Sequence, residues 1–140
     1  MKLHLSMRVE DLESAKMFYS SLFNQPPTLI RENYIKWDVK DPAVNFVVES
    51  GRGDKGFDHV GIQVTSDTEL QDLAVRMKQT DHKFLDIENT DCCFANMDKA
   101  WIKGSANENW EAFLTHHQDS QDYGTDRTDL LEDCCTTSCC

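Results

Sequence analysis

Two short segments, fifty-five residues apart, alternate between polar and apolar side chains along the chain. Such alternation is typical of strands with one buried face. In residues 3–9 and 58–64 every second side chain is apolar, and the polar face of each segment carries a histidine, His4 in the first and His59 in the second. Residues with helical spacing follow each segment at once, so the pattern predicts a strand and then a helix at two places.

Both predicted helices have a recognisable start and one apolar stripe. The first begins at Glu10 and has acidic residues in its first turn, where the helix dipole favours them; its stripe consists of Leu12, Ala15, Tyr19 and Leu22. In the second, Ser66 is the expected cap and Glu69 its capping-box partner. The apolar stripe of this second helix consists of Leu70, Leu73, Ala74 and Met77.

Short strand candidates follow each helix, separated by turn residues. They are residues 28–30, 34–39 and 44–49 in the first half, and 84–88, 92–97, 100–103 and 110–115 in the second. Residues 51–56 hold three of the six glycines and are the expected linker. An order of strand, helix and then about three strands, met twice, predicts an α+β fold of paired βαβββ modules that form a curved sheet around a cavity. The modules are residues 1–50 and 57–115, within one domain of residues 1–115.

The polar faces of the repeated strands bring metal-binding residue types into equivalent positions. His4 and His59 correspond to each other, and the last strand of the second module points Glu111 to the same side, in the position that Asn45 occupies in the first module. Two imidazoles and one carboxylate form the facial triad that suits Fe(II). A lone histidine is more often a core residue, but a repeated one with an inward carboxylate favours a metal site at His4, His59 and Glu111.

The six cysteines form three adjacent pairs, Cys92 with Cys93, Cys134 with Cys135, and Cys139 with Cys140. Neighbouring cysteines cannot join distant segments except by pairing between clusters, so soft-metal binding is favoured over a disulfide framework. Six thiols in three adjacent pairs are typical ligands of a soft metal. Asp98 and Lys99, just after the first pair, are interpreted as solvated turn charges.

Charge and hydropathy exclude other classes of protein. The chain has 140 residues, 14 basic against 25 acidic, and a formal net charge of -11, so a nucleic-acid surface is not expected. No apolar run approaches the roughly 20 residues that cross a bilayer, and the start resembles a strand rather than a signal peptide, which predicts a cytoplasmic protein without membrane association. Residues 116–140, with six acidic residues and one basic, are expected to form a flexible, cysteine-rich tail.

These motifs resemble the vicinal oxygen chelate superfamily, which includes glyoxalases, bleomycin and fosfomycin resistance proteins and extradiol dioxygenases. Residues 3–23, with the sequence LHLSMRVEDLESAKMFYSSLF, and residues 58–64, DHVGIQV, are typical of it. Residues 88–101, ENTDCCFANMDKAW, look like the narrower branch of carbon–arsenic lyases and cadmium-induced proteins. The resemblance covers residues 3–115.

The resemblance implies an Fe(II)-dependent enzyme that uses dioxygen to cleave trivalent organoarsenicals, such as methyl- or aryl-arsenites, to inorganic arsenite. It assigns iron to His4, His59 and Glu111, and arsenic to Cys92 and Cys93. Cys134, Cys135, Cys139 and Cys140 are candidate auxiliary thiols, and the sequence leaves a homodimer open.

Two other functions remain compatible with the sequence. A binding protein could sequester arsenic or cadmium through its thiols without catalysis, because the last seven residues alone contain four of them. A glyoxalase or thiol-transferase type of metalloenzyme would want a second carboxylate, or a different metal, in the position of Asn45.

Overall fold

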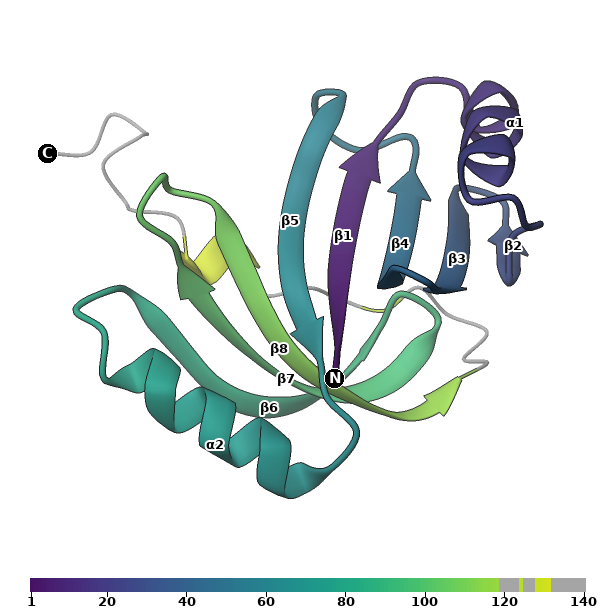
Figure 1. Cartoon of the computed structure of the whole chain (residues 1–140). Coiled ribbons are helices and arrows are strands. Elements are labelled where there is room, and N and C mark those ends of the chain that lie inside the picture. The colour runs from purple at the N-terminus through teal and green to yellow at the C-terminus, as the bar shows by residue number, and fades with distance from the viewer. Residues whose placement is uncertain (119–123, 125–127, 132–140) are drawn as a thin grey trace, which may run out of the picture. The chain divides into compact units, whose positions relative to one another are not determined.

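The computed structural model describes residues 1–118, 124 and 128–131. The chain forms two compact units, which meet between Ile62 and Gln63. The order of elements is βαβββ twice over, so the predicted α+β class and the repeat are confirmed (Figure 1). In the described part of the chain, neither helix is long and apolar enough to cross a membrane.

The first unit holds one helix and the strands of the first module. Its elements are β1 (Lys2–Arg8), α1 (Leu12–Leu22), β2 (Leu29–Arg31), β3 (Tyr34–Lys40) and β4 (Ala43–Glu49), and β5 (Gly56–Gln63) follows. The strand order is β2-β3-β4-β1-β5, and β1 runs parallel to β4 with His4 opposite Asn45. In this register Asn45 lies on the strand next to His4 and level with it.

Helix α1 covers β3 and β4 with an aromatic core (Figure 1). The Asp11 side chain caps it by accepting hydrogen bonds from the backbone N–H groups of Glu13 and Ser14. Trp37 is fully buried, and the rings of Tyr19 and Phe46 lie 4.5 Å apart. Burying a large apolar side chain contributes about 2 kcal/mol. The predicted stripe is wrong at Leu22, which is 62% exposed, since its neighbour Phe23 makes the core contacts instead.

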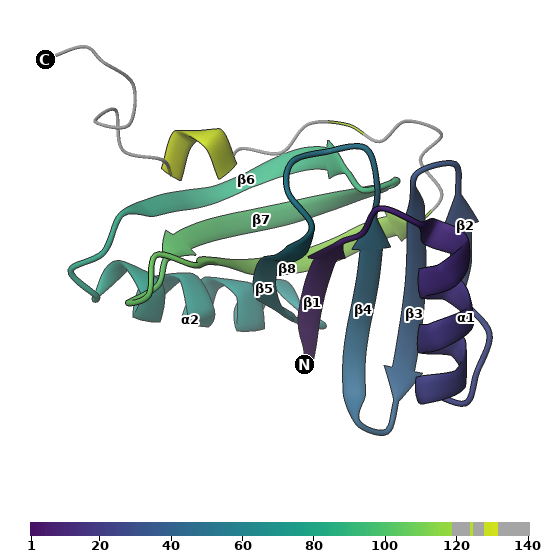
Figure 2. The same cartoon turned by 90° about the horizontal axis from the view of Figure 1, so that it is seen from above.

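The second unit holds α2 (Asp67–Lys78), β6 (Phe84–Cys92), β7 (Ala95–Lys103), β8 (Asn109–Gln118) and a short helix, η1 (Thr128–Leu131). Strands β6, β7 and β8 are antiparallel neighbours, and α2 lies along them (Figure 2). The predicted stripe of α2 is buried in full. Ser66 caps this helix as expected, while the Glu69 carboxylate accepts hydrogen bonds from Thr65.

Two strand boundaries in the second module differ from the prediction. Cys92 ends β6 instead of beginning a strand, and β7 is one continuous strand where two short strands were expected on either side of Asp98 and Lys99. Strand β8 continues to Gln118, three residues past the expected end, and Leu131 is only 1% exposed. Ordered strand and a buried side chain are therefore found beyond residue 115, where the flexible tail was expected to begin.

Candidate functional site

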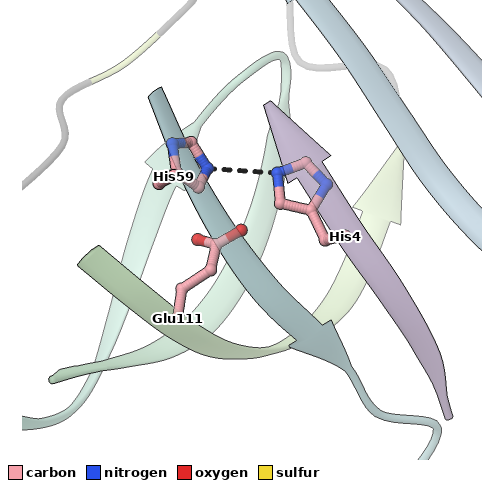
Figure 3. Close-up of side chains that lie close together, drawn as sticks. All are labelled: His4, His59 and Glu111. Carbon is pink, nitrogen blue, oxygen red and sulfur yellow. Dashed lines mark hydrogen bonds between the residues drawn. The ribbon is translucent and has the colours of Figure 1, made fainter. Parts of the chain in front are cut away.

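His4 and His59 lie side by side in the first unit (Figure 3). Both side chains are buried, at 6% and 4% exposure, although each comes from the polar face of its strand. Their Nε2 atoms are 3.1 Å apart. The structure therefore brings together the two histidines that the repeat places in equivalent positions.

The other nitrogen of each ring is held by an acceptor. The His4 Nδ1 lies 2.9 Å from the backbone oxygen of Asn45, and the His59 Nδ1 lies 2.8 Å from Oδ2 of Asp58. A carbonyl or an ionised carboxylate can only accept, so both Nδ1 atoms donate. This leaves the two Nε2 atoms as the nitrogens that carry lone pairs, which is the usual arrangement of histidines that bind a metal.

The pair of Nε2 atoms fits a metal ion. Two lone pairs that face each other at 3.1 Å repel unless a proton or a cation lies between them. Metal–nitrogen bonds of about 2.1 Å that meet at a right angle put two nitrogens about 3.0 Å apart. The observed spacing therefore suits two neighbouring ligands of one ion.

Arg8 and Asp58 support His59 from behind. The Arg8 Nη2 lies 2.5 Å from Oδ1 of Asp58, whose other oxygen binds the imidazole. Burial of Asp58 opposes its ionisation, but the hydrogen bond to His59 and the positive charge of Arg8 outweigh burial and lower the pKa of this carboxyl. Asp58 is therefore a charged acceptor that fixes the orientation of the His59 ring, a role that its position beside the histidine could have suggested.

Glu111 lies in the second unit, on β8, and is 3% exposed (Figure 3). Its Oε2 is 3.0 Å from the Nζ of Lys99, which is buried as deeply on β7. The ammonium of Lys99 lies 5.4 Å from the centre of the Trp101 ring and 5.8 Å from that of Phe113. A buried carboxylate needs such a partner, because an uncompensated charge inside a protein is costly.

The interpretation of Lys99 as a solvated turn charge is wrong. It belongs to the continuous strand β7, on the same face as Trp101, and its counter-ion is twelve residues further along the chain. Asp98 points to the other face, where it accepts hydrogen bonds from Asn89 and His116. The alternation of β7 could have shown that the two charges face opposite ways.

Cys92 and Cys93 hold their sulfur atoms 2.9 Å apart. Cys92 is fully buried and Cys93 is partly exposed. They stand at the tip of the β6–β7 hairpin, where Cys92 pairs with Ala95 and the loop consists of Cys93 and Phe94. The other four cysteines, Cys134, Cys135, Cys139 and Cys140, lie outside the described residues.

The hairpin loop has an unusual backbone. Cys93 and Phe94 both have positive φ, at 56° and 62°. Two-residue hairpin loops of type I′ need this conformation, but they normally place asparagine and glycine there. Side chains with a Cβ avoid it at a cost of roughly 1–2 kcal/mol per residue, and such backbone conformations concentrate at functional sites.

Comparison with known proteins places the chain in a family. It is 31% identical over 115 residues to a trivalent organoarsenical cleaving enzyme of Thermomonospora curvata, covering 81% of this chain and 76% of the relative. It is 32% identical over 125 residues to the cadmium-induced protein CadI of Mycobacterium tuberculosis, covering 89% and 82%. The chain belongs to the family of these proteins. No family model matches the sequence.

Solved structures agree on the fold of this organoarsenical-lyase and CadI family. A glyoxalase/bleomycin resistance protein/dioxygenase superfamily member from Vibrio splendidus has a TM-score of 0.56 at 10% identity, covering 81% of this chain and 97% of that one. Homoprotocatechuate 2,3-dioxygenase from Arthrobacter globiformis has a TM-score of 0.60 at 18% identity, covering 92% and 39%. These likenesses show that the chain has the fold found in the glyoxalase/bleomycin resistance protein/dioxygenase superfamily.

Proposed function

We propose that the protein is an Fe(II)-dependent carbon–arsenic lyase that cleaves trivalent organoarsenicals and releases inorganic arsenite. The observation that carries this proposal is the buried pair of Nε2 atoms of His4 and His59, whose Nδ1 atoms are both held as donors. Two relatives that are 31% and 33% identical to this chain are named as trivalent organoarsenical cleaving enzymes.

Glu111 is the proposed third ligand. It offers a buried carboxylate oxygen where each histidine offers a nitrogen (Figure 3). Within the second unit, Gln63 donates a hydrogen bond to Thr115, and Val64 donates to the backbone of Phe113, so the end of β5 runs beside β8. His59 lies four residues before Gln63, and Glu111 lies four residues before Thr115. If these strands run parallel, as β1 and β4 do in the first module, both side chains share one face.

Two imidazoles and one carboxylate leave open positions on an Fe(II) ion, and iron with dioxygen would supply the oxidation that breaks the carbon–arsenic bond. The neutral Asn45 beside His4 favours this chemistry over a glyoxalase type of site, which would use a second carboxylate there. The task of Lys99 is to hold the Glu111 carboxylate in place and to compensate its charge when it is buried.

Cys92 and Cys93 are the proposed arsenic ligands. Their two sulfurs lie close enough together to bind one arsenic atom, and the partial exposure of Cys93 gives the substrate access. An arsenite R–As(OH)₂ and two thiols exchange to R–As(SR′)₂ and two waters, which leaves the organic group on arsenic. The tail cysteines are proposed only as auxiliary thiols.

The proposal is tested by separating the arsenic species after the iron-loaded protein reacts with phenylarsenite in air. We expect inorganic arsenite to accumulate, and neither the anaerobic sample nor the Glu111→Gln variant should release it. Phenylarsenite that stays bound but intact under all conditions would contradict catalysis and favour the alternative function of arsenic sequestration.

A further inference from the structure

The chain returns to the thiol hairpin after β8. Gly124 forms an antiparallel bridge with Cys92 on the outer side of β6, and η1 contacts both β6 and β7 (Figure 2). Leu131, the last residue of η1, is 1% exposed. We call Gly124 and Thr128–Leu131 the strap. It lies against the strand that ends in the proposed arsenic ligands.

Only glycine fits where the strap touches the hairpin. Gly124 has a φ of +77°, and a Cβ at this position would lie 1.7 Å from the backbone oxygen of Asp91 and 2.9 Å from the backbone nitrogen of Cys92. Both atoms belong to the backbone, so they cannot move aside as a flexible side chain could. Any larger residue must push Gly124 and the Asp91–Cys92 peptide apart.

The hairpin needs support from outside its own loop. Cys93 and Phe94 hold a positive φ that residues with a Cβ rarely adopt, and this loop conformation sets the direction of the Cys93 side chain relative to Cys92. The backbone of Cys92 is held from two sides, by Ala95 of β7 and by Gly124 of the strap. The strap thus contacts the backbone of one of the two cysteines whose sulfurs lie 2.9 Å apart.

We propose that the strap is a positioning element of the arsenic site, with Gly124 as the residue that fixes Cys92 so that both thiols bind one arsenic atom. This role rests on the proposed function. The strap would raise the affinity for arsenic by fixing the positions of the two thiols. A chelate is tight only when the second sulfur meets the arsenic without further rearrangement. This role is independent of the metal, since no strap residue is among the proposed iron ligands.

The test is the Gly124→Ala variant with Gly51→Ala as its matched control. Gly51 has almost the same backbone angle, with a φ of +82°, but a Cβ there would meet nothing within 4 Å. Both variants therefore introduce the same conformational strain, and only Gly124→Ala pushes on the thiol hairpin. Leu131→Ala, which loosens the other end of the strap without adding a clash, is the second variant.

Phenylarsenite binding is measured by titration, together with the affinity for Fe(II) and the single-turnover rate at saturating phenylarsenite. We expect Gly124→Ala to bind phenylarsenite at least about 10-fold more weakly than the wild type. Leu131→Ala should also lower the affinity for phenylarsenite. Affinity for Fe(II) and the rate at saturation should stay at the wild-type level, which a general loss of folding would not allow. Gly51→Ala should match the wild type in all three.

Wild-type affinity for phenylarsenite in both Gly124→Ala and Leu131→Ala would overturn this role of the strap. An equal loss in Gly124→Ala and Gly51→Ala would overturn it as well, since strain alone would then be the cause. A wild-type protein that binds no phenylarsenite would contradict the proposed function itself, and with it this inference.

Discussion

Arg8 reaches the proposed metal ligand His59 through Asp58. The guanidinium holds one oxygen of the carboxylate, and the other oxygen accepts the hydrogen bond from the imidazole. Groups in this position fix the tautomer and the direction of a ligating histidine, so they contribute to metal affinity without touching the ion.

Replacing Asp58 by asparagine tests this contribution. The amide oxygen can still accept from His59, but the charge is lost, and we expect Fe(II) affinity to fall by about 10- to 100-fold. Equilibrium dialysis under anaerobic conditions measures it. The control is Asp86→Asn, which removes the charge of an exposed ion pair with Lys78 and should leave iron binding unchanged. Equal affinity in both variants would show that Asp58 has no such role.

The two thiols are separable from the metal site at the level of single residues. Cys92→Ser and Cys93→Ser each keep the size of the side chain but remove one sulfur, so the chelate becomes a single bond. We expect phenylarsenite affinity to fall by about 100-fold or more, because the second thiol acts at high effective concentration, while Fe(II) binding persists. A double serine variant with wild-type affinity for phenylarsenite would remove the proposal of a dithiolate site.

At the scale of elements, the start of α2 is a local stabilising feature. The Ser66 hydroxyl accepts a hydrogen bond from the backbone N–H of Glu69, so Ser66→Ala should lower the free energy of unfolding by about 1 kcal/mol. Thr68→Ala, on an exposed position of the same turn, should change it by less than about 0.5 kcal/mol. Urea unfolding measures both, and equal effects would contradict the role of the cap.

The same helix terminus predicts a pH dependence. The hydrogen bonds that the Glu69 carboxylate accepts from the backbone and side chain of Thr65 lower its pKa. A lowered folded-state pKa stabilises the protein above the ordinary pKa of glutamate, and the contribution is lost as the pH falls through the lowered value. Glu69→Gln should therefore be less stable than the wild type at neutral pH and approach it under acid conditions; a constant difference down to pH 2 would contradict this.

Elements with a local pattern could be predicted from sequence, and elements that depend on distant partners could not. The alternation around His4 and His59 predicts strands where the structure has β1 and β5, and the stripe of α2 is buried as predicted. Both patterns follow from neighbouring residues. The sequence predicts two short strands in place of β7, because Asp98 and Lys99 together suggest a turn. Lys99 is buried only because Glu111 on another strand compensates its charge, and no local pattern shows that.

At the scale of the whole molecule, the repeat is what made the pairing of His4 and His59 predictable. One buried histidine would have been an ordinary core residue, but two at equivalent positions, with Asn45 level with the first, indicated a shared polar cavity. The strap could not be foreseen, because residues 116–140 are acidic and rich in cysteine and have few apolar side chains. The contacts of Gly124 with Cys92 and of η1 with β6 and β7 show that part of this segment packs on these strands.

The central claim is the proposal that His4, His59 and Glu111 bind iron, and iron stoichiometry tests it most directly. Anaerobic dialysis against Fe(II) should load the wild-type protein, while His4→Ala, His59→Ala and Glu111→Ala should each lose iron, since two remaining ligands bind it poorly. Glu88→Ala, which removes an exposed carboxylate on β6, is the control and should load fully. A folded Glu111→Ala variant that retains the full iron content of the wild type would contradict the claim.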